Sequence, residues 1–108
     1  EEKRKLFRRY TDAFANVSGV NLVAEPDGCR SNYWLQTLML DKSVVEQKEA
    51  ILTATNDAGL MTRPVWTLTH SLAPYRECPK MELPVAQSLE KRLINLPSSA
   101  WLGMEGVG

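Results

Sequence analysis

One mostly apolar run constrains the fold more than any other part of the chain. It extends from Tyr33 to Leu40 and has polar residues on both sides. An apolar run of this length is typical of a β-strand at the centre of a sheet, with both of its faces covered. Such a strand needs other strands beside it and helices over it, so the rest of the chain has to supply both.

The first helix is predicted over residues 1–17. Its apolar side chains recur at helical spacing: Leu6, Phe7, Tyr10, Ala13, Phe14 and Val17. Ser18 and Gly19 are expected to end it, because glycine readily adopts positive φ. Basic residues fill the rest of this helix. Such residues usually form a solvated face, although they are also able to hold phosphate groups.

A second helix is predicted to follow a capping box, in which Ser43 and Glu46 satisfy each other's backbone amides. The stripe that should face the core contains Val44, Ile51, Ala54 and Ala58. Gly59 suits the position just after the end of this helix.

The remaining elements are a third helix and two short strands. The helix is predicted over residues 83–94, with Pro84 in its first turn, a stripe of Ala86, Leu89 and Leu93, and Asn95 and Pro97 at its end. Residues 20–23 and 60–63 have strand character, and Pro64 restricts the second of these to an edge or a break. Residues 71–81 are predicted to be a loop.

The predicted fold is α+β, with a small, mostly antiparallel sheet packed against about three helices. We expect residues 1–108 to form a single domain, because a chain of this length buries roughly two-thirds of its unfolded surface. A hydrophobic fraction of 44% and a charged fraction of 24% are ordinary for a globular domain. The chain begins with Glu1 rather than methionine, which suits a fragment of a longer protein.

Composition argues against several classes of partner. The formal net charge is zero, which argues against nucleic acid or an anionic membrane as the main partner. No apolar run reaches the length of about 18 residues that a membrane span needs, and no signal peptide is visible. Cys29 and Cys78 lack zinc-ligand spacing, so no metal site is predicted. Their pairing stays open, although two reduced, partly buried thiols in a cytoplasmic protein are favoured.

His70 and Arg63 are the first candidate binding residues. His70 is the only histidine, and Pro64, Trp66 and Pro74 could brace its segment so that the ring faces a cleft. An imidazole there is able to donate to a sugar hydroxyl or a phosphate, although a lone histidine is more often structural or exposed. The guanidinium of Arg63 suits a carboxylate or a phosphate, or else an acidic side chain of its own domain.

Asn32, Tyr33 and Trp34 form a second candidate group at the start of the apolar run. Asn32 is able to hydrogen-bond a sugar, and the two aromatic rings are able to pack on a sugar ring. Alternatively, Trp34 belongs to the core and Asn32 caps the strand. The chain shows no complete active site, because it lacks a nucleophile elbow, a Walker A loop and a dinucleotide-binding glycine motif.

Four segments in this order resemble the C-terminal domain of the DegT/DnrJ/EryC1/StrS sugar aminotransferases. They are residues 31–35, 61–70, 71–76 and 93–97, and the resemblance extends from about Lys5 to Leu102. The chain is similar in particular to the branch of this family that makes 4-amino sugars for legionaminic acid or bacillosamine. Many relatives have Pro-Leu ahead of the histidine, where this chain has Leu68 and Thr69, so the local backbone is expected to differ.

The resemblance implies a pyridoxal-phosphate enzyme that moves an amino group, taken from glutamate, to the 4-keto carbon of a UDP-linked deoxysugar. It implies that the cofactor-anchoring lysine lies in a large N-terminal domain that is absent here, so this chain should contain no catalytic residue. It also implies a homodimer, an approach of residues 62–75 to the active site, and a position for His70 near the substrate.

Two other functions remain open. The first is an autonomous α+β module that binds a protein partner through the apolar face of its first helix and has no catalytic activity. The second is a phosphate- or RNA-binding module that uses the basic residues of the same helix, and the zero net charge argues against it.

Overall fold

The computed structural model describes residues 1–104, and its elements confirm the α+β class. The α-helices are α1 (Glu2–Phe14), α2 (Lys48–Asp57) and α3 (Pro84–Arg92). The strands are β1 (Val20–Leu22), β2 (Gln36–Leu40), β3 (Arg63–Pro64) and β4 (Leu93–Leu96). Short 3-10 helices are η1 (Lys42–Gln47), η2 (Thr69–Ser71), η3 (Ala73–Tyr75) and η4 (Ala100–Gly103).

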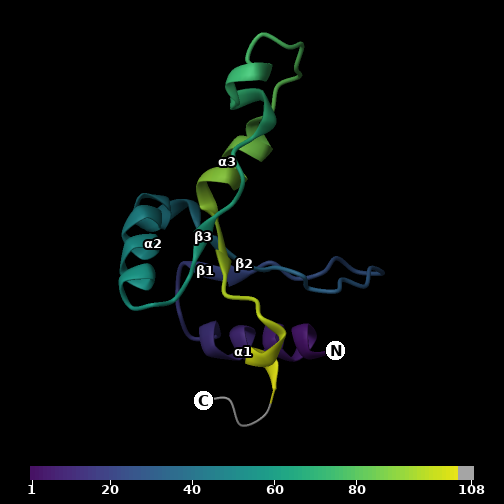
Figure 1. Ribbon diagram of the computed structural model, residues 1–108, viewed down its shortest axis with the longest axis vertical. Helices are drawn as coiled ribbons and strands as arrows, with labels where there is room; N and C mark the ends of the chain where they lie inside the picture. The colour runs from purple at the N-terminus through teal and green to yellow at the C-terminus, as the bar shows by residue number, and fades with distance from the viewer. Residues whose placement is uncertain (105–108) are drawn as a thin grey trace.

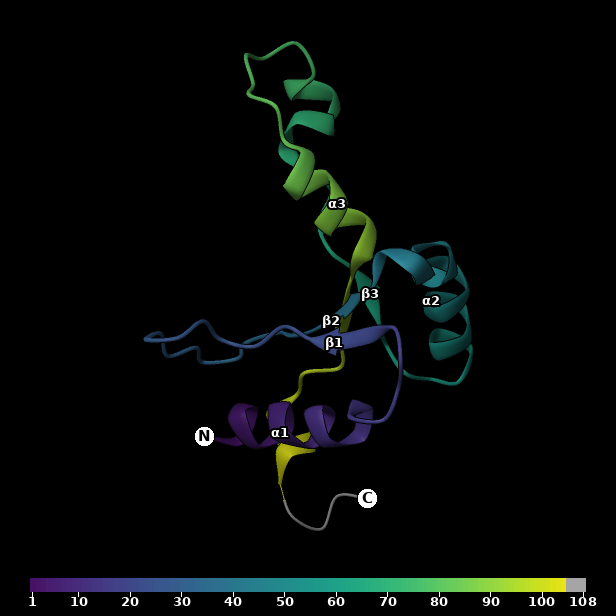
Figure 2. The same cartoon turned by 180° about the vertical axis from the view of Figure 1, so that it is seen from behind.

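The four strands form one antiparallel sheet in the order β1-β2-β4-β3 (Figure 1). The last strand in the sequence therefore lies inside the sheet, where Ile94 of β4 pairs with Leu38 of β2. β3 is an edge strand, as Pro64 predicted, because proline has no amide hydrogen to donate to a further strand. Both views show α3, with η2 and η3, extending away from the sheet (Figures 1 and 2).

The prediction of a helix over residues 83–94 is wrong at its end. The α3 helix stops at Arg92, and Leu93 already has extended dihedral angles, with φ −95° and ψ 136°. The spacing of Leu89 and Leu93 suits a helix, but pairing with β2 and β3 outweighs this local preference. Ile94 is fully buried as a result.

The central strand β2 is covered on one face rather than on both, so that prediction is also wrong. Gln36, Leu38 and Leu40 are buried, whereas the alternate residues Thr37 and Met39 are half-exposed. The core on the covered face is built by Leu38, Leu40, Leu52 and Ile94, with Phe14, Val20, Leu22, Val44, Ile51 and Leu96 packed around them. The helices α1 and α2 therefore contribute to the same face.

The predicted capping box does not form. Residues 42–47 make η1, α2 begins only at Lys48, and no side chain caps either start. In α2 the buried residue is Leu52, while Ala54 and Ala58 of the predicted stripe are exposed. Gly59 is confirmed as the residue after the helix, with φ +81°.

The α1 helix lies beside residues 100–103, which form η4 (Figure 2). Leu6 is buried, while Phe7, Tyr10 and Phe14 are half-buried. η4 lies directly against this helix, because a Cβ atom on Gly103 would collide with the Glu2 carbonyl oxygen. The helix is therefore part of the fold and does not offer the free face that a partner-binding module would need.

Residues 23–35 connect β1 to β2 as a long arm whose base is tied to α1 (Figure 2). Arg4 donates to both carboxylate oxygens of Glu25, at 2.9 and 2.5 Å. The Ser31 amide donates to the same carboxylate at 2.6 Å. The Tyr33 ring stacks on Phe7, with 4.1 Å between the ring centroids. Residues distant in sequence thus hold the arm in place.

The first prediction concerns the fully buried Ile94. Ile94→Ala should lower the free energy of unfolding by about 2–5 kcal/mol, and Ile94→Val by about 0.5–1.5 kcal/mol, because each leaves a cavity beside Leu38. Urea denaturation measures both changes. Val85→Ala is the matched control, since Val85 is 71% exposed on α3 and should change stability by less than about 0.5 kcal/mol. Equal effects at the two positions would contradict the buried place of β4.

The second prediction concerns pH. The hydrogen bonds from Arg4, and then from the Ser31 amide, lower the pKa of Glu25 from 4.5 to about 2. A carboxyl with a lowered folded-state pKa stabilises the fold above its unfolded pKa and loses this contribution as pH falls. Glu25→Gln should therefore destabilise the chain at pH 6–7, and the difference from the wild type should shrink between about pH 4.5 and 2.

Thermal melts of the two proteins across this pH range measure the difference. Glu77→Gln is the control, because Glu77 is an exposed carboxylate in the distant loop that follows η3. A gap between wild type and Glu25→Gln that does not change with pH would contradict the ion pair.

Candidate functional site

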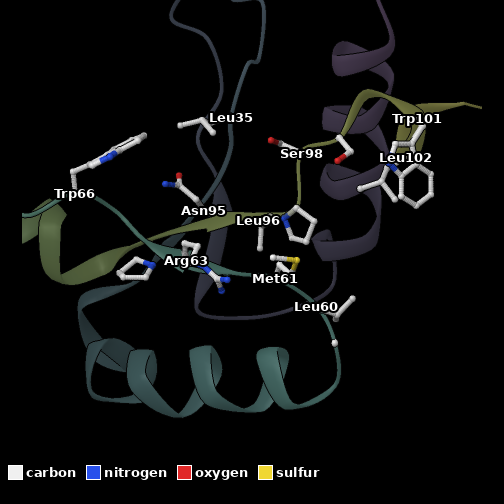
Figure 3. Close-up of a pocket in the computed structure, with 14 residues that line it drawn as sticks. Leu35, Leu60, Met61, Arg63, Trp66, Asn95, Leu96, Ser98, Trp101 and Leu102 are labelled. Atoms are coloured by element: carbon white, nitrogen blue, oxygen red, sulfur yellow. The ribbon is translucent and has the colours of Figure 1, made fainter.

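An open groove of about 650 Å³ lies beside the β3 edge of the sheet (Figure 3). It is lined by Leu35, by Gly59, Leu60, Met61, Arg63, Pro64 and Trp66, and by Asn95, Leu96, Pro97, Ser98, Ser99, Trp101 and Leu102. We call this the groove. Its size is within the range of small-molecule sites. Most of its lining is apolar, so the few polar groups in it determine what it is able to recognise.

A row of polar side chains crosses the sheet into the groove. Thr37, Asn95 and Arg63 are paired in register across β2, β4 and β3, which places them on the same face. The Thr37 hydroxyl donates to the Asn95 Oδ1 oxygen at 3.0 Å. The Asn95 Nδ2 group has no partner within residues 1–104, so it remains available as a donor. This face is the one that α1 and α2 leave open.

Arg63 is held by neutral groups only. Its Nη1 donates to the Asn56 Oδ1 oxygen at 2.6 Å and to the Thr62 carbonyl at 2.8 Å. Asn56 is itself anchored, since its Nδ2 donates to the Leu52 carbonyl at 2.8 Å. The acidic partner considered from the sequence is not found among the described residues. The guanidinium is therefore positioned without being neutralised, as an anion-binding group should be.

Four large apolar side chains stand exposed around the groove. Trp66 is 69% exposed, Met61 67%, Trp101 54% and Leu60 53%. Figure 3 shows Trp66 and Leu35 at one end and Trp101 and Leu102 at the other. An apolar patch of this kind marks a surface that binds something.

His70 lies elsewhere. It is half-buried in η2 and lines a separate hollow of about 400 Å³ that it shares with Tyr75, Cys78 and Lys80. No residue lines both this hollow and the groove. Within this chain, the structure therefore does not bring His70 and Arg63 together.

Asn32, Tyr33 and Trp34 lie in a third place, at the base of the arm. The Asn32 Oδ1 oxygen accepts from the Trp34 amide at 3.0 Å in a tight turn. Tyr33 is 6% exposed and has a φ of +48°, and one face of its ring is stacked on Phe7. Trp34 is 67% exposed, so the alternative that it belongs to the core is wrong.

Sequence reasoning missed Asn95 and Trp101 as parts of a site. The local pattern predicts Asn95 at the end of a helix, whereas the strand β4 places it beside Arg63. For Trp101 no local pattern was informative, because its place depends on how η4 packs on α1.

Other chemical features are limited. Cys29 and Cys78 are both unpaired and exposed, so the expectation of partly buried thiols is wrong. Residues 1–104 contain no cluster of three metal-binding side chains. None of the helices in this part of the chain is long and apolar enough to cross a membrane.

Two comparisons, with a family model and with known proteins, relate this chain to aminotransferases. The model of the DegT/DnrJ/EryC1/StrS aminotransferase family matches residues 1–107. GDP-perosamine synthase of Vibrio cholerae is 27% identical over 103 residues, which are 94% of this chain and 27% of that protein. EpsN of Bacillus subtilis (strain 168), named as a pyridoxal phosphate-dependent aminotransferase, is 31% identical over 71 residues, or 66% of this chain and 18% of EpsN.

Among solved structures, DesI in the presence of its TDP-sugar product superposes with a TM-score of 0.79 at 22% identity, covering 89% of this chain and 25% of DesI. At this identity the likeness establishes the fold. The chain spans about a quarter or less of the length of each of these proteins.

Proposed function

The chain belongs to the DegT/DnrJ/EryC1/StrS aminotransferase family, and we propose that it is the small C-terminal domain of a pyridoxal-phosphate-dependent nucleotide-sugar aminotransferase. The whole protein would transfer an amino group, from glutamate, to the 4-keto carbon of a UDP-linked deoxysugar. The names of its relatives support a sugar substrate and this cofactor. The choice of UDP, the 4-keto position and glutamate extends beyond those names.

The observation that carries the proposal is the open groove with Arg63 in it. A positioned guanidinium without an acidic partner in the described residues, set among exposed aromatic rings, suits one wall of a cleft for an anionic substrate. In this role Arg63 binds and orients the substrate, while Trp66 and Trp101 exclude water around it. A free-standing domain would have little reason to leave such a surface exposed.

The chain itself is not suited to anchor the cofactor. Pyridoxal phosphate supplies an electron sink and carries the amino group when it is bound. Covalent anchoring needs a lysine amine, and no lysine lines the groove. Lys48 donates to the Glu90 carbonyl at 2.7 Å, and Lys3 donates to the carbonyls of Trp34 and Ser98. We therefore place the anchoring lysine in a large domain outside this chain.

We propose that the other candidate residues contact the substrate from outside the groove. His70 would donate to the sugar or to a phosphate oxygen from the second hollow, where Lys80 also lies. Asn32 and the exposed Trp34 would contact it from the base of the arm, which Tyr33 holds against α1. We propose that a homodimer completes the cleft. A cytoplasmic location is supported by the two unpaired, exposed thiols.

The third prediction tests the function directly. The whole protein that contains this chain should transfer nitrogen-15 from labelled glutamate to a UDP-linked 4-keto sugar, as mass spectrometry of the sugar would record. The 108-residue chain alone should give no stoichiometric, site-specific adduct after incubation with pyridoxal phosphate and borohydride. A single trapped lysine in this chain would contradict the assignment of the domain. Failure of the whole protein to aminate any nucleotide sugar would contradict the activity.

The fourth prediction concerns His70 in the whole protein. His70→Ala should slow the half-reaction with the keto-sugar roughly five- to hundredfold, because a substrate hydrogen bond is worth about 1–3 kcal/mol. The half-reaction with glutamate should change little. His70→Asn should lose less, since its amide can still donate, and the melting temperature should hardly change.

Single-turnover rates of both half-reactions, with melting temperatures, make the comparison. Ser71→Ala is the neighbouring control, because Ser71 is exposed at the end of η2. Equal losses in both half-reactions, together with a large fall in melting temperature, would mean that His70 is structural.

A further inference from the structure

We propose that the groove binds the nucleoside diphosphate part of the substrate, and not the amino donor. This proposal rests on the proposed function in taking the substrate to be a nucleotide sugar, and it names which part of that substrate the groove holds. It is based on three features of the groove: its aromatic surface, its one cation and its one unused amide donor.

The aromatic surface selects a ligand with a flat ring. The exposed indole of Trp66 lies at the same end of the groove as Leu35 (Figure 3). A heterocyclic base stacks favourably on an indole face, and stacking of one base on an aromatic side chain is worth about 1–3 kcal/mol. Glutamate has no ring, so it would leave this surface uncovered.

The polar groups select a ring that carries an acceptor and a phosphate. The Nδ2 group of Asn95 is a donor with no partner in the described residues, because its Oδ1 is already engaged by Thr37. A ring carbonyl oxygen would accept from it. Arg63 is the register partner of Asn95 on the adjacent strand, so the two side chains start from neighbouring positions and both line the groove.

The guanidinium is prepared for a diphosphate. Its Nη1 is fixed by Asn56 and Thr62, which are neutral, so the remaining N–H groups and the full positive charge are left for a ligand. Asn56 thus acts as a positioning residue. Thr62, which is 2% exposed, is locked in turn by Thr55 through hydroxyls 2.5 Å apart.

The test uses tryptophan fluorescence of the 108-residue chain, with circular dichroism to confirm that each variant is folded. UDP should change the emission saturably, uridine and pyrophosphate should bind more weakly than UDP, and glutamate should neither bind nor compete. Trp66→Phe should remove most of the signal, whereas Val85→Ala is the control that should bind UDP like the wild type, because Val85 is 71% exposed on α3 and lies outside the groove. Arg63→Gln should weaken UDP binding roughly five- to hundredfold.

A second variant separates the loss of the guanidinium from a loss of the fold. Arg63→Lys keeps the charge but not the fork, so it should bind UDP with intermediate affinity. The proposal would be overturned if neither Arg63 variant changed the affinity for UDP, or if glutamate bound with the same affinity as UDP. Self-association in sedimentation that Trp66→Ser abolishes would also overturn it, if UDP does not bind, because the groove would then be a protein interface.

The whole protein separates this proposal from the proposed function. In it, Arg63→Gln should raise the KM for the nucleotide sugar and leave the KM for glutamate unchanged. If the whole protein aminates a nucleotide sugar but the groove does not bind UDP, only this inference fails. If UDP binds the groove but no amination occurs, the proposed function fails while the binding site stands.

Discussion

The pairing of β4 with β2 is the constraint on which the rest of the structure depends. It brings residues 93–96 from the end of the chain into the middle of the sheet, where Ile94 is buried against Leu38. On the other face it sets Asn95 between Thr37 and Arg63. Beyond Pro97 the chain continues into η4, which covers α1. One strand therefore organises the core, the groove and the cover of the first helix.

The two arginines Arg4 and Arg63 show how partner chemistry separates a structural from a binding role. Arg4 meets the carboxylate of Glu25, so its charge is neutralised and its function is to hold the arm. Arg63 meets an amide and a carbonyl oxygen, so it gains the same geometric restraint but keeps its full charge. The positive charge of Arg63 is therefore available to pair with an anionic ligand.

Local patterns predicted what depends on local chemistry. The α+β class, α1, the edge position that Pro64 imposes and the positive φ of Gly59 all follow from neighbouring residues. The predicted end of α3 was wrong because the spacing of Leu89 and Leu93 suits a helix. This spacing does not show that residues 93–96 pair with β2 and β3 as a strand. The groove was missed for the same reason: Asn95 and Arg63 meet only through pairing across 32 residues of chain. The chemistry of an arginine side chain was enough to suggest Arg63 as a binding residue. The residues that surround Arg63 in the fold could not be predicted from the sequence.

We propose that the groove between Trp66 and Trp101 faces the substrate cleft of a larger enzyme. The most direct measurement is a crystal structure of the whole protein with pyridoxal phosphate and a UDP-sugar. We expect the groove to be open to the cofactor, with Arg63 and Asn95 within hydrogen-bonding distance of the nucleotide. A groove filled by side chains of the same polypeptide, with the nucleotide bound elsewhere, would contradict it.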